Sequence, residues 1–141
     1  MRRVLLAALL WLSTVAPAPA AVVIHASNGG QIGKYLVLFA LVRQAGERVI
    51  IDGPCLSACT LVLSMVPRER ICVTRRAVLG FHAAWLPDRR GRPVNHAGGT
   101  RLLMAAYPAP VRAWISRRGG LSSRLILLRG RELAALYPVC G

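Results

Sequence analysis

The sequence predicts an α/β fold in which a mostly parallel sheet is built from βαβ units. Apolar residues make up 55% of the 141 residues and charged residues 17%, a balance typical of a chain that folds. The spacing of the apolar residues alternates along the chain between that of strands and that of helices, and glycine or proline separates the segments. Strands that alternate with helices form βαβ units, which indicates a parallel sheet.

The first twenty residues have the layout of a secretory signal peptide. Arg2 and Arg3 give a positive start, residues 4–15 are almost entirely apolar, and Ala18-Pro19-Ala20 offers a cleavage site. The apolar run is shorter than the roughly 20 residues that span a bilayer, although an uncleaved anchor is the alternative. We therefore expect residues 1–20 to be a signal peptide, residues 21–141 to be a single domain, and the mature protein to be periplasmic or secreted.

The first predicted elements are a strand, a helix and a second strand. Residues 22–24 are β-branched and precede a turn, which predicts a short buried strand. In residues 32–45 apolar positions recur every three or four residues, which predicts a helix that Gly46 closes. Residues 48–52 predict a second strand, which the following glycine–proline pair breaks.

The remaining segments continue the alternation. Residues 57–66 are apolar nearly all round and predict a buried helix, while residues 70–81 predict a third strand region that two arginines interrupt. Residues 88–99 are polar and contain glycine and proline, which predicts a loop. Residues 100–118 predict a helical stretch broken by its prolines, and residues 132–136 predict a short final helix.

Four cysteines, Cys55, Cys59, Cys72 and Cys140, lie in the predicted mature chain. An even number in an exported domain predicts two disulfides, for which three pairings are possible. We favour Cys55 with Cys59 and Cys72 with Cys140, because the second bond then holds the C-terminus on the core. A zinc site is the alternative, but the Cys-x3-Cys spacing has no matching second pair, so we expect neither a metal nor another cofactor.

The chain is strongly basic, with 19 lysines and arginines, five aspartates and glutamates, and a net charge of +14. The scarcity of acids excludes an acid-rich metal site. The arginines lie in scattered pairs without interleaved aromatic residues, so we expect no dedicated nucleic-acid binding. We expect instead a weak attraction to anionic surfaces.

Three motifs follow successive predicted strands: Gly29-Gly30, Ser57 and His82. Because the carboxyl ends of parallel strands line one crevice, we expect these motifs to converge. Glycine amides can stabilise an oxyanion, a serine can attack an acyl carbon, and a histidine can accept its proton. Each motif also has an ordinary structural explanation, namely a glycine turn, a helix cap and a histidine that hydrogen-bonds in the core or at the surface.

The order and spacing of these motifs resemble the superfamily of Clp protease proteolytic subunits and crotonases, and most closely a secreted bacterial branch with a Cys-x-Ser-Ala-Cys motif. The resemblance covers residues 22–136, and the segments that carry it are Asn28-Gly29-Gly30, Cys55-Leu56-Ser57-Ala58-Cys59 and Gly80-Phe81-His82. It implies a Clp protease/crotonase-like fold, with Ser57 as nucleophile, His82 as general base and the amides of Gly29 and Gly30 as oxyanion donors. It also implies a homo-oligomer, because members of the superfamily commonly form trimers or larger rings.

The acid that orients the histidine in peptidases of that superfamily has no clear counterpart here. Residues 121–131, where the resemblance places it, contain neither aspartate nor glutamate. Glu132 is the nearest candidate for the third member, and its alternative role is a carboxylate in the first turn of a helix. Asp52 and Asp88 are further candidates without motif support.

Two hypotheses on function follow. The first is an exported serine hydrolase, a peptidase, that acts on a peptide or other acyl substrate through Ser57 and His82. The alternative is a non-catalytic, disulfide-stapled crotonase-like protein of the periplasm that binds a peptide, a lipid or a polyanion. The complete set of glycines, serine and histidine favours the hydrolase, whereas the missing acid favours the binding protein.

Overall fold

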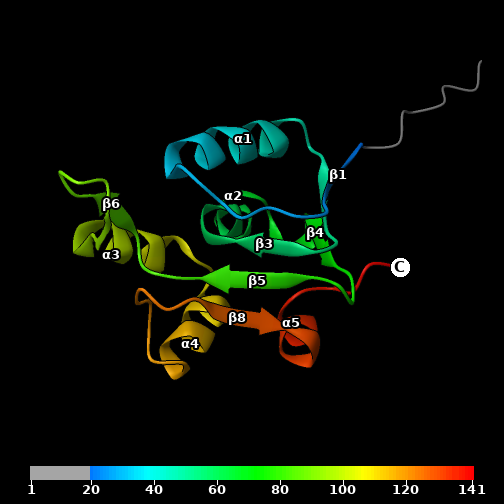
Figure 1. Ribbon diagram of the computed structural model, residues 1–141. Coiled ribbons are helices and arrows are strands. Elements are labelled where there is room, and N and C mark those ends of the chain that lie inside the picture. The colour runs from blue at the N-terminus through cyan, green and yellow to red at the C-terminus, as the bar shows by residue number, and fades with distance from the viewer. Residues whose placement is uncertain (1–19) are drawn as a thin grey trace, which may run out of the picture.

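The computed structural model describes residues 20–141, so that the predicted signal peptide lies outside the described residues apart from Ala20. Figure 1 shows the arrangement of the elements. In chain order they are β1 (Ala21–Ile24), α1 (Ile32–Gln44), β2 (Arg48–Ile51), β3 (Pro54–Leu56), the 3-10 helix η1 (Ser57–Leu61), α2 (Val62–Met65), the 3-10 helix η2 (Arg68–Arg70), β4 (Ile71–Val73), β5 (Val78–Phe81), β6 (Trp85–Pro87), β7 (Pro93–Asn95), α3 (Ala97–Ala106), α4 (Ala109–Arg117), β8 (Ile126–Arg129) and α5 (Gly130–Leu136).

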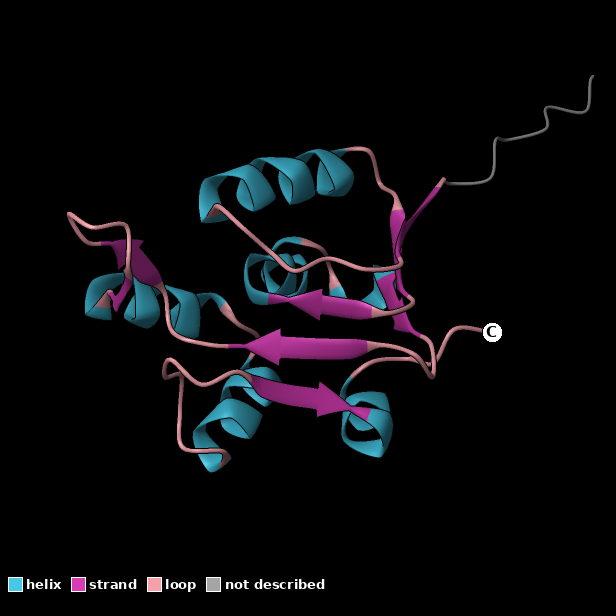
Figure 2. Ribbon diagram, in the orientation of Figure 1, coloured by secondary structure: helices cyan, strands magenta, loops and turns pink. Residues whose placement is uncertain are grey.

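The described strands form three small sheets, as Figure 2 shows, and not one parallel sheet. The first, β1-β2-β4, is parallel throughout. In the second, β3 and β5 are parallel, but β8 runs antiparallel to β5. The third is the antiparallel hairpin of β6 and β7. The predicted fold class, a mostly parallel βαβ sheet of the Clp protease/crotonase type, is therefore wrong.

The fold-class prediction failed because short breaks move the chain from one sheet to another. A Cβ on Gly53 would lie 1.9 Å from the carbonyl oxygen of His25, so the backbone turns where only glycine fits, and β3 then joins the second sheet. The region 70–81, predicted as one strand region, is divided by a turn closed from the amide of Ala77 to the carbonyl of Thr74. Its two halves, β4 and β5, lie in different sheets.

The helices lie close to their predicted positions, but the loop prediction fails in part and several strands were not predicted. α1 ends one residue before the predicted boundary, and the predicted stretch 100–118 is two helices, α3 and α4, with Pro108 between them. The predicted loop 88–99 instead contributes β7 and the start of α3, so that part of the prediction is wrong. Three further strands were not predicted, namely β3 and β8, which complete the second sheet with β5, and β6, which pairs with β7.

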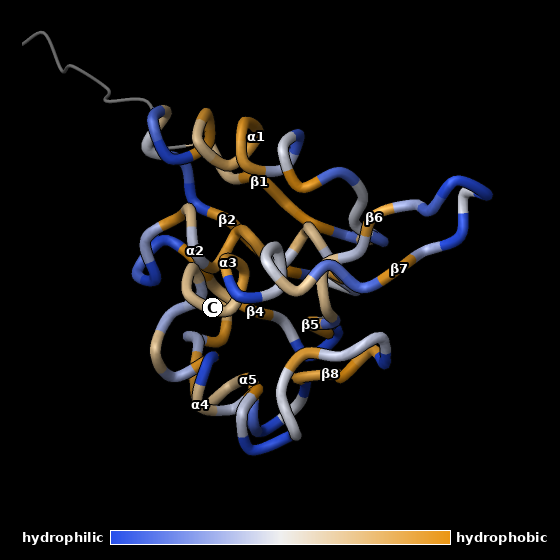
Figure 3. Tube along the Cα trace, turned by 90° about the vertical axis from the view of Figure 1, so that its left-hand side faces the viewer, coloured by the Kyte–Doolittle hydropathy of each residue, from blue (hydrophilic) through white to orange (hydrophobic). Residues whose placement is uncertain are grey.

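The hydrophobic core joins the two larger sheets to the helices that cover them. α1 packs on η1 and α2, and α5 packs on β8. The ring of Phe81 meets Tyr107 edge to face at 5.3 Å and Trp114 at 5.9 Å, which connects β5 to the segment around α4. None of the helices between residues 20 and 141 has the length and hydropathy that a membrane span needs. Figure 3 shows mostly hydrophobic colour along the strands of the two larger sheets and mostly hydrophilic colour in the outer turns.

Two disulfides, Cys55–Cys59 and Cys72–Cys140, confirm the predicted bonds and the favoured pairing. Cys72 lies in β4, and Cys140 follows an isolated parallel bridge between Val73 and Val139. The second disulfide thus ties the C-terminal segment to the edge of the first sheet, as expected from the sequence.

Removing the Cys72–Cys140 disulfide is expected to cost more stability than removing Cys55–Cys59. The Cys72–Cys140 bond closes a loop of 68 residues, whereas the Cys55–Cys59 bond closes a loop of only four. By the dependence of chain entropy on loop length, the double substitution Cys72→Ala/Cys140→Ala should lower the free energy of unfolding by about 4 kcal/mol, and Cys55→Ala/Cys59→Ala by about 2 kcal/mol. Urea unfolding of both variants checks the order, and equal losses would contradict it.

Candidate active site

Ser57 and His82 are 25 residues apart in the sequence, but their side chains are in contact. The Oγ of Ser57 lies 2.8 Å from the Nε2 of His82. The contact follows from strand pairing, because β3 and β5 are parallel and Leu56 is in register with Gly80. Ser57 follows the end of β3 and His82 follows the end of β5, so both emerge at the same edge of the second sheet.

Ser57 sits on a sharp turn between a strand and a helix. Among the described residues it is the one non-glycine residue with positive φ, at +57°. β3 leads into this turn and η1 follows it directly. The Cys55–Cys59 disulfide joins the two sides of the turn. Non-glycine residues in this backbone region are strained and concentrate at functional sites, and the nucleophiles of many hydrolases occupy such strand-to-helix turns.

A buried chain of hydroxyl groups holds the backbone of Ser57. Thr60 donates from Oγ1 to the carbonyl oxygen of Ser57 at 2.7 Å. The hydroxyl of Tyr107 lies 2.7 Å from the same Oγ1, and it donates because the proton of Thr60 is already used. Burial raises the pKa of Tyr107, which keeps this phenol protonated.

Removing a hydroxyl group from this hydrogen-bonded series is expected to loosen the turn at Ser57. Thr60→Val leaves the carbonyl of Ser57 and the hydroxyl of Tyr107 without their buried partner, which should lower the free energy of unfolding by about 1–3 kcal/mol. Tyr107→Phe keeps the bond from Thr60 to Ser57, so its loss should be about 1 kcal/mol. Urea unfolding of both variants measures the difference. A larger loss in Tyr107→Phe would contradict the assigned direction of the hydrogen bonds.

A backbone carbonyl orients the ring of His82. The Nδ1 of His82 lies 2.7 Å from the carbonyl oxygen of Ala83. A carbonyl oxygen can only accept, so Nδ1 carries the proton and Nε2 presents its lone pair to the hydroxyl of Ser57. Ala83 is itself fixed, because its amide donates to the carbonyl oxygen of Ser122 at 2.7 Å. The Ala83 carbonyl thus occupies the place where a triad would have its acid.

The predicted third member, Glu132, is not beside His82. Its carboxylate accepts two hydrogen bonds from Arg118, at 2.7 and 2.8 Å, and these lower its pKa. Asp52 pairs with Arg76 and accepts from Thr74 at 2.7 Å, which lowers the pKa of Asp52 to about 2. The orienting group could not be predicted, because a main-chain carbonyl is present at every residue and leaves no signal in the sequence.

The loop that carries Gly29 and Gly30 lies directly against Ser57. The amide of Ser27 donates to the carbonyl of Pro54 at 2.7 Å, and the amide of Leu56 donates to the carbonyl of Ser27 at 2.8 Å, so this loop runs alongside β3. A Cβ on Gly29, whose φ is +81°, would lie 2.5 Å from the Cβ of Ser57.

The backbone amides near Ser57 differ in whether they already donate a hydrogen bond. The amide of Gly29 makes a long hydrogen bond of 3.4 Å to the Oγ of Ser27. Within residues 20–141, neither the amide of Gly30 nor that of Ala58 donates a hydrogen bond. The nitrogen of Ala58 lies 2.8 Å from the Cβ position of Gly29, which places this amide next to the glycine loop. Ala58 is therefore a candidate oxyanion donor that the sequence analysis missed.

A cavity of about 760 Å³ opens over these groups. Its size is within the range of sites that hold small molecules or short peptide segments. Ser57 and His82 share its lining with the glycine loop and with a mostly apolar wall, and no lining residue is acidic, lysine or arginine. The apolar wall consists mainly of Ile32, Ala84, Trp85, Leu86, Pro87, Leu103 and Tyr107. Such a cavity favours an uncharged, apolar group beside the serine.

Comparison with known proteins adds no family assignment. No protein-family model matches the chain, and no curated protein is significantly similar to it. Across residues 20–141 no three or more histidine, cysteine, aspartate or glutamate side chains are grouped so that they could hold a metal ion.

Proposed function

We propose that the protein is an exported serine hydrolase in which Ser57 attacks the carbonyl carbon of a peptide or other acyl substrate. The observation that carries this proposal is the 2.8 Å contact between the Oγ of Ser57 and the Nε2 of His82, made at a turn of positive φ that opens into an apolar cavity. The motif spacing, which resembles that of peptidases of the Clp protease superfamily, supports a peptide as the substrate. The two disulfides and the predicted signal peptide support the periplasm or the exterior as its location.

The proposed reaction has two acyl-transfer steps. His82 accepts the proton of Ser57 at Nε2 while the Oγ forms a bond to the acyl carbon, and the carbonyl oxygen gains the negative charge. The free amides of Gly30 and Ala58 donate to that oxygen. His82 then protonates the leaving amine or alcohol as its bond to the acyl carbon breaks. Water then attacks the acyl-serine with His82 as base, and the bond between the acyl carbon and the Oγ of Ser57 breaks as His82 returns the proton to that oxygen, which releases the acid.

The carbonyl of Ala83 supplies part of what an acid supplies in a triad. It fixes the tautomer and the ring orientation, because it accepts from Nδ1. It lacks the full negative charge that stabilises an imidazolium, so we expect a slower enzyme than one with a complete triad.

Labelling with a fluorophosphonate probe tests the proposal. Oxidised, processed protein should be labelled, and peptide mapping should place the label on Ser57. Ser57→Ala should abolish labelling, whereas the control Ser123→Ala, at an exposed serine outside the cavity lining, should not change it. A folded protein that stays unlabelled would favour the non-catalytic hypothesis, which predicts salt-sensitive binding that survives Ser57→Ala.

A further inference from the structure

The β6–β7 hairpin extends from the body of the molecule beside the cavity. All six residues of its two strands are exposed. Figure 3 shows the hairpin standing away from the rest of the chain, with hydrophobic colour in part of each strand and a hydrophilic tip. Isolated two-stranded hairpins are marginally stable in water. This hairpin is anchored at its base, where the amide of His96 donates to the carbonyl of Ala84 at 2.7 Å.

The exposed apolar side chains of the hairpin point to a partner. Trp85 is 48% exposed, Leu86 is 55% exposed and Val94 is 53% exposed. Leu86 and Val94 are directly opposite each other in the hairpin, and Trp85 precedes Leu86 in the same strand. Exposed apolar side chains that polar residues surround mark interaction sites. Trp85 and Leu86 also line the cavity, so the partner would lie beside the Ser57 site.

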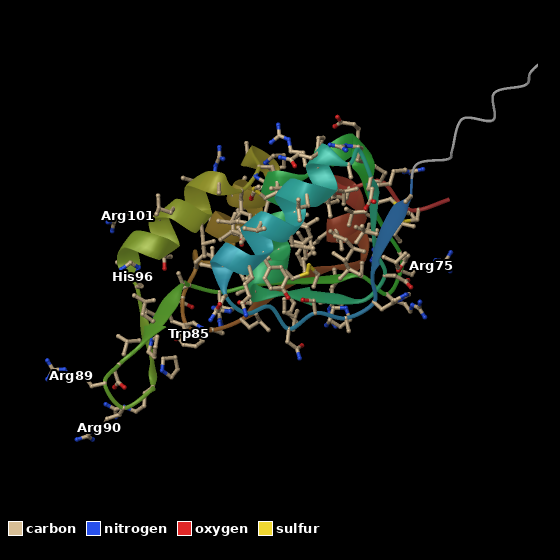
Figure 4. The ribbon with its side chains drawn as sticks, turned by 90° about the horizontal axis from the view of Figure 1, so that it is seen from above. Arg75, Trp85, Arg89, Arg90, His96 and Arg101 are labelled. Atoms are coloured by element: carbon tan, nitrogen blue, oxygen red, sulfur yellow. A yellow bond between two sulfur atoms is a disulfide. The ribbon has the colours of Figure 1, made fainter. Side chains whose placement is uncertain are left out.

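The charged side chains around these apolar residues are mostly arginines, and most of them have no acidic partner among the described residues. Figure 4 shows Arg89 and Arg90 at the tip of the hairpin and Arg101 on the neighbouring helix α3. Among residues 20–141 none of these three side chains has an acidic partner or a hydrogen bond. Asp88 is the one acid of the hairpin, and it pairs with Arg92 at 2.9 Å. Hydrogen bonds from Arg92 and Arg90 lower the pKa of Asp88, which keeps the pair ionic.

We propose that this basic arm, formed by residues 85–101, binds the surface of an anionic lipid bilayer. Tryptophan favours the boundary between headgroups and acyl chains, and arginines close to it attract anionic headgroups. A soluble polyanion matches the arginines but leaves the exposed leucine and valine in water, so the combination favours a bilayer. The arm places the cavity next to the membrane. The proposal does not depend on whether Ser57 is catalytic.

The fluorescence of Trp85 can report the binding of the arm to a membrane. Within residues 20–141 the tryptophans are Trp85, which is 48% exposed, and Trp114, which is 3% exposed and lies in the core. Processed protein, with its N-terminus determined by mass spectrometry, is mixed with vesicles of neutral phosphatidylcholine alone or with added phosphatidylglycerol. We expect sedimentation with the anionic vesicles, together with a blue shift of the tryptophan emission, and neither with neutral vesicles.

Matched charge reversals locate the binding surface. Arg90→Glu and Arg75→Glu change the net charge equally, and both arginines are exposed, but Figure 4 places Arg75 at the opposite end of the molecule. Because each basic residue near the surface contributes about 1 kcal/mol, Arg90→Glu should lower vesicle partitioning at least about fivefold, and Arg75→Glu should lower it clearly less. Val94→Ser should weaken binding, whereas Val139→Ser, at a similarly exposed valine near the C-terminus, should not.

Three results would overturn the proposal. The first is an equal loss of partitioning in Arg90→Glu and Arg75→Glu, which would indicate attraction by net charge alone. The second is binding to heparin or DNA at the same salt concentration while anionic vesicles leave the emission unchanged, which would indicate a polyanion site. The third is the absence of binding to anionic vesicles by folded protein. Ser57→Ala should bind vesicles like the wild type. Failure of the hydrolase proposal, seen as absent labelling, is therefore distinguishable from failure of the membrane proposal, seen as absent vesicle binding.

Discussion

Replacing His82 by alanine is expected to slow the labelling of Ser57 by a fluorophosphonate about 10³-fold, within the range that a positioned general base supplies. The Nε2 of His82 is the group 2.8 Å from the Oγ of Ser57, and its lone pair faces the hydroxyl because Nδ1 is bound to the carbonyl of Ala83. Without the ring, the hydroxyl must lose its proton to water. The residual rate should come from the free amides around Ser57.

The measurement is the second-order rate constant of labelling, determined with His25→Ala as the control. His25 is a histidine outside the cavity, and its side chain is 74% exposed. We expect the control to label at the wild-type rate and both variants to unfold at nearly the wild-type urea concentration. A His82→Ala variant that labels as fast as the control would show that another group activates Ser57, or that the reaction at Ser57 needs no base.

Replacing Gly29 by alanine is expected to remove labelling altogether and to destabilise the protein. The new Cβ would lie 2.5 Å from the Cβ of Ser57, 2.6 Å from the carbonyl oxygen of Leu56 and 2.8 Å from the nitrogen of Ala58. Two of these atoms belong to the backbone, so a change of rotamer cannot relieve the contact. The φ of +81° adds a conformational cost of about 1–2 kcal/mol. Either the glycine loop or the turn at Ser57 must move.

A second glycine of the same region provides the control. Gly33 lies in the first turn of α1, and nothing lies within 4 Å of its Cβ position. Gly33→Ala should therefore label normally and gain up to about 1 kcal/mol in stability, because alanine favours the helix. Labelling and urea unfolding of both variants are compared. If Gly29→Ala kept both wild-type values, the packing of the glycine loop against Ser57 would be refuted.

Local patterns in the sequence determined much of the secondary structure. The periodicity of residues 32–45 predicted α1 to within one residue, and Pro108 separates α3 from α4 because proline ends a helix. The two disulfides followed from an even number of cysteines and their positions. These features depend on neighbouring residues or on residue type, which the sequence displays directly.

The sequence also predicted the pair of Ser57 and His82, but the structure brings the two residues together in a different way from the one expected. One parallel sheet, whose strand ends share a crevice, was expected to bring the two residues together. The two side chains meet instead because β3 and β5 are parallel neighbours within a small mixed sheet. The parallel pair is sufficient, since the residues after two paired parallel strands emerge at the same edge. The candidate pair therefore agrees with the geometry even though the fold-class prediction was wrong.

The tertiary structure alone decided the sheets and the main-chain groups of the site. Strand pairing between distant segments depends on turns such as the one at Gly53, where the approach of the His25 carbonyl excludes a side chain. The carbonyl of Ala83 and the amide of Ala58 belong to residues with unremarkable side chains, so only their positions give them a role. A sequence displays side-chain chemistry and local periodicity, whereas the direction of a backbone dipole is set by long-range packing.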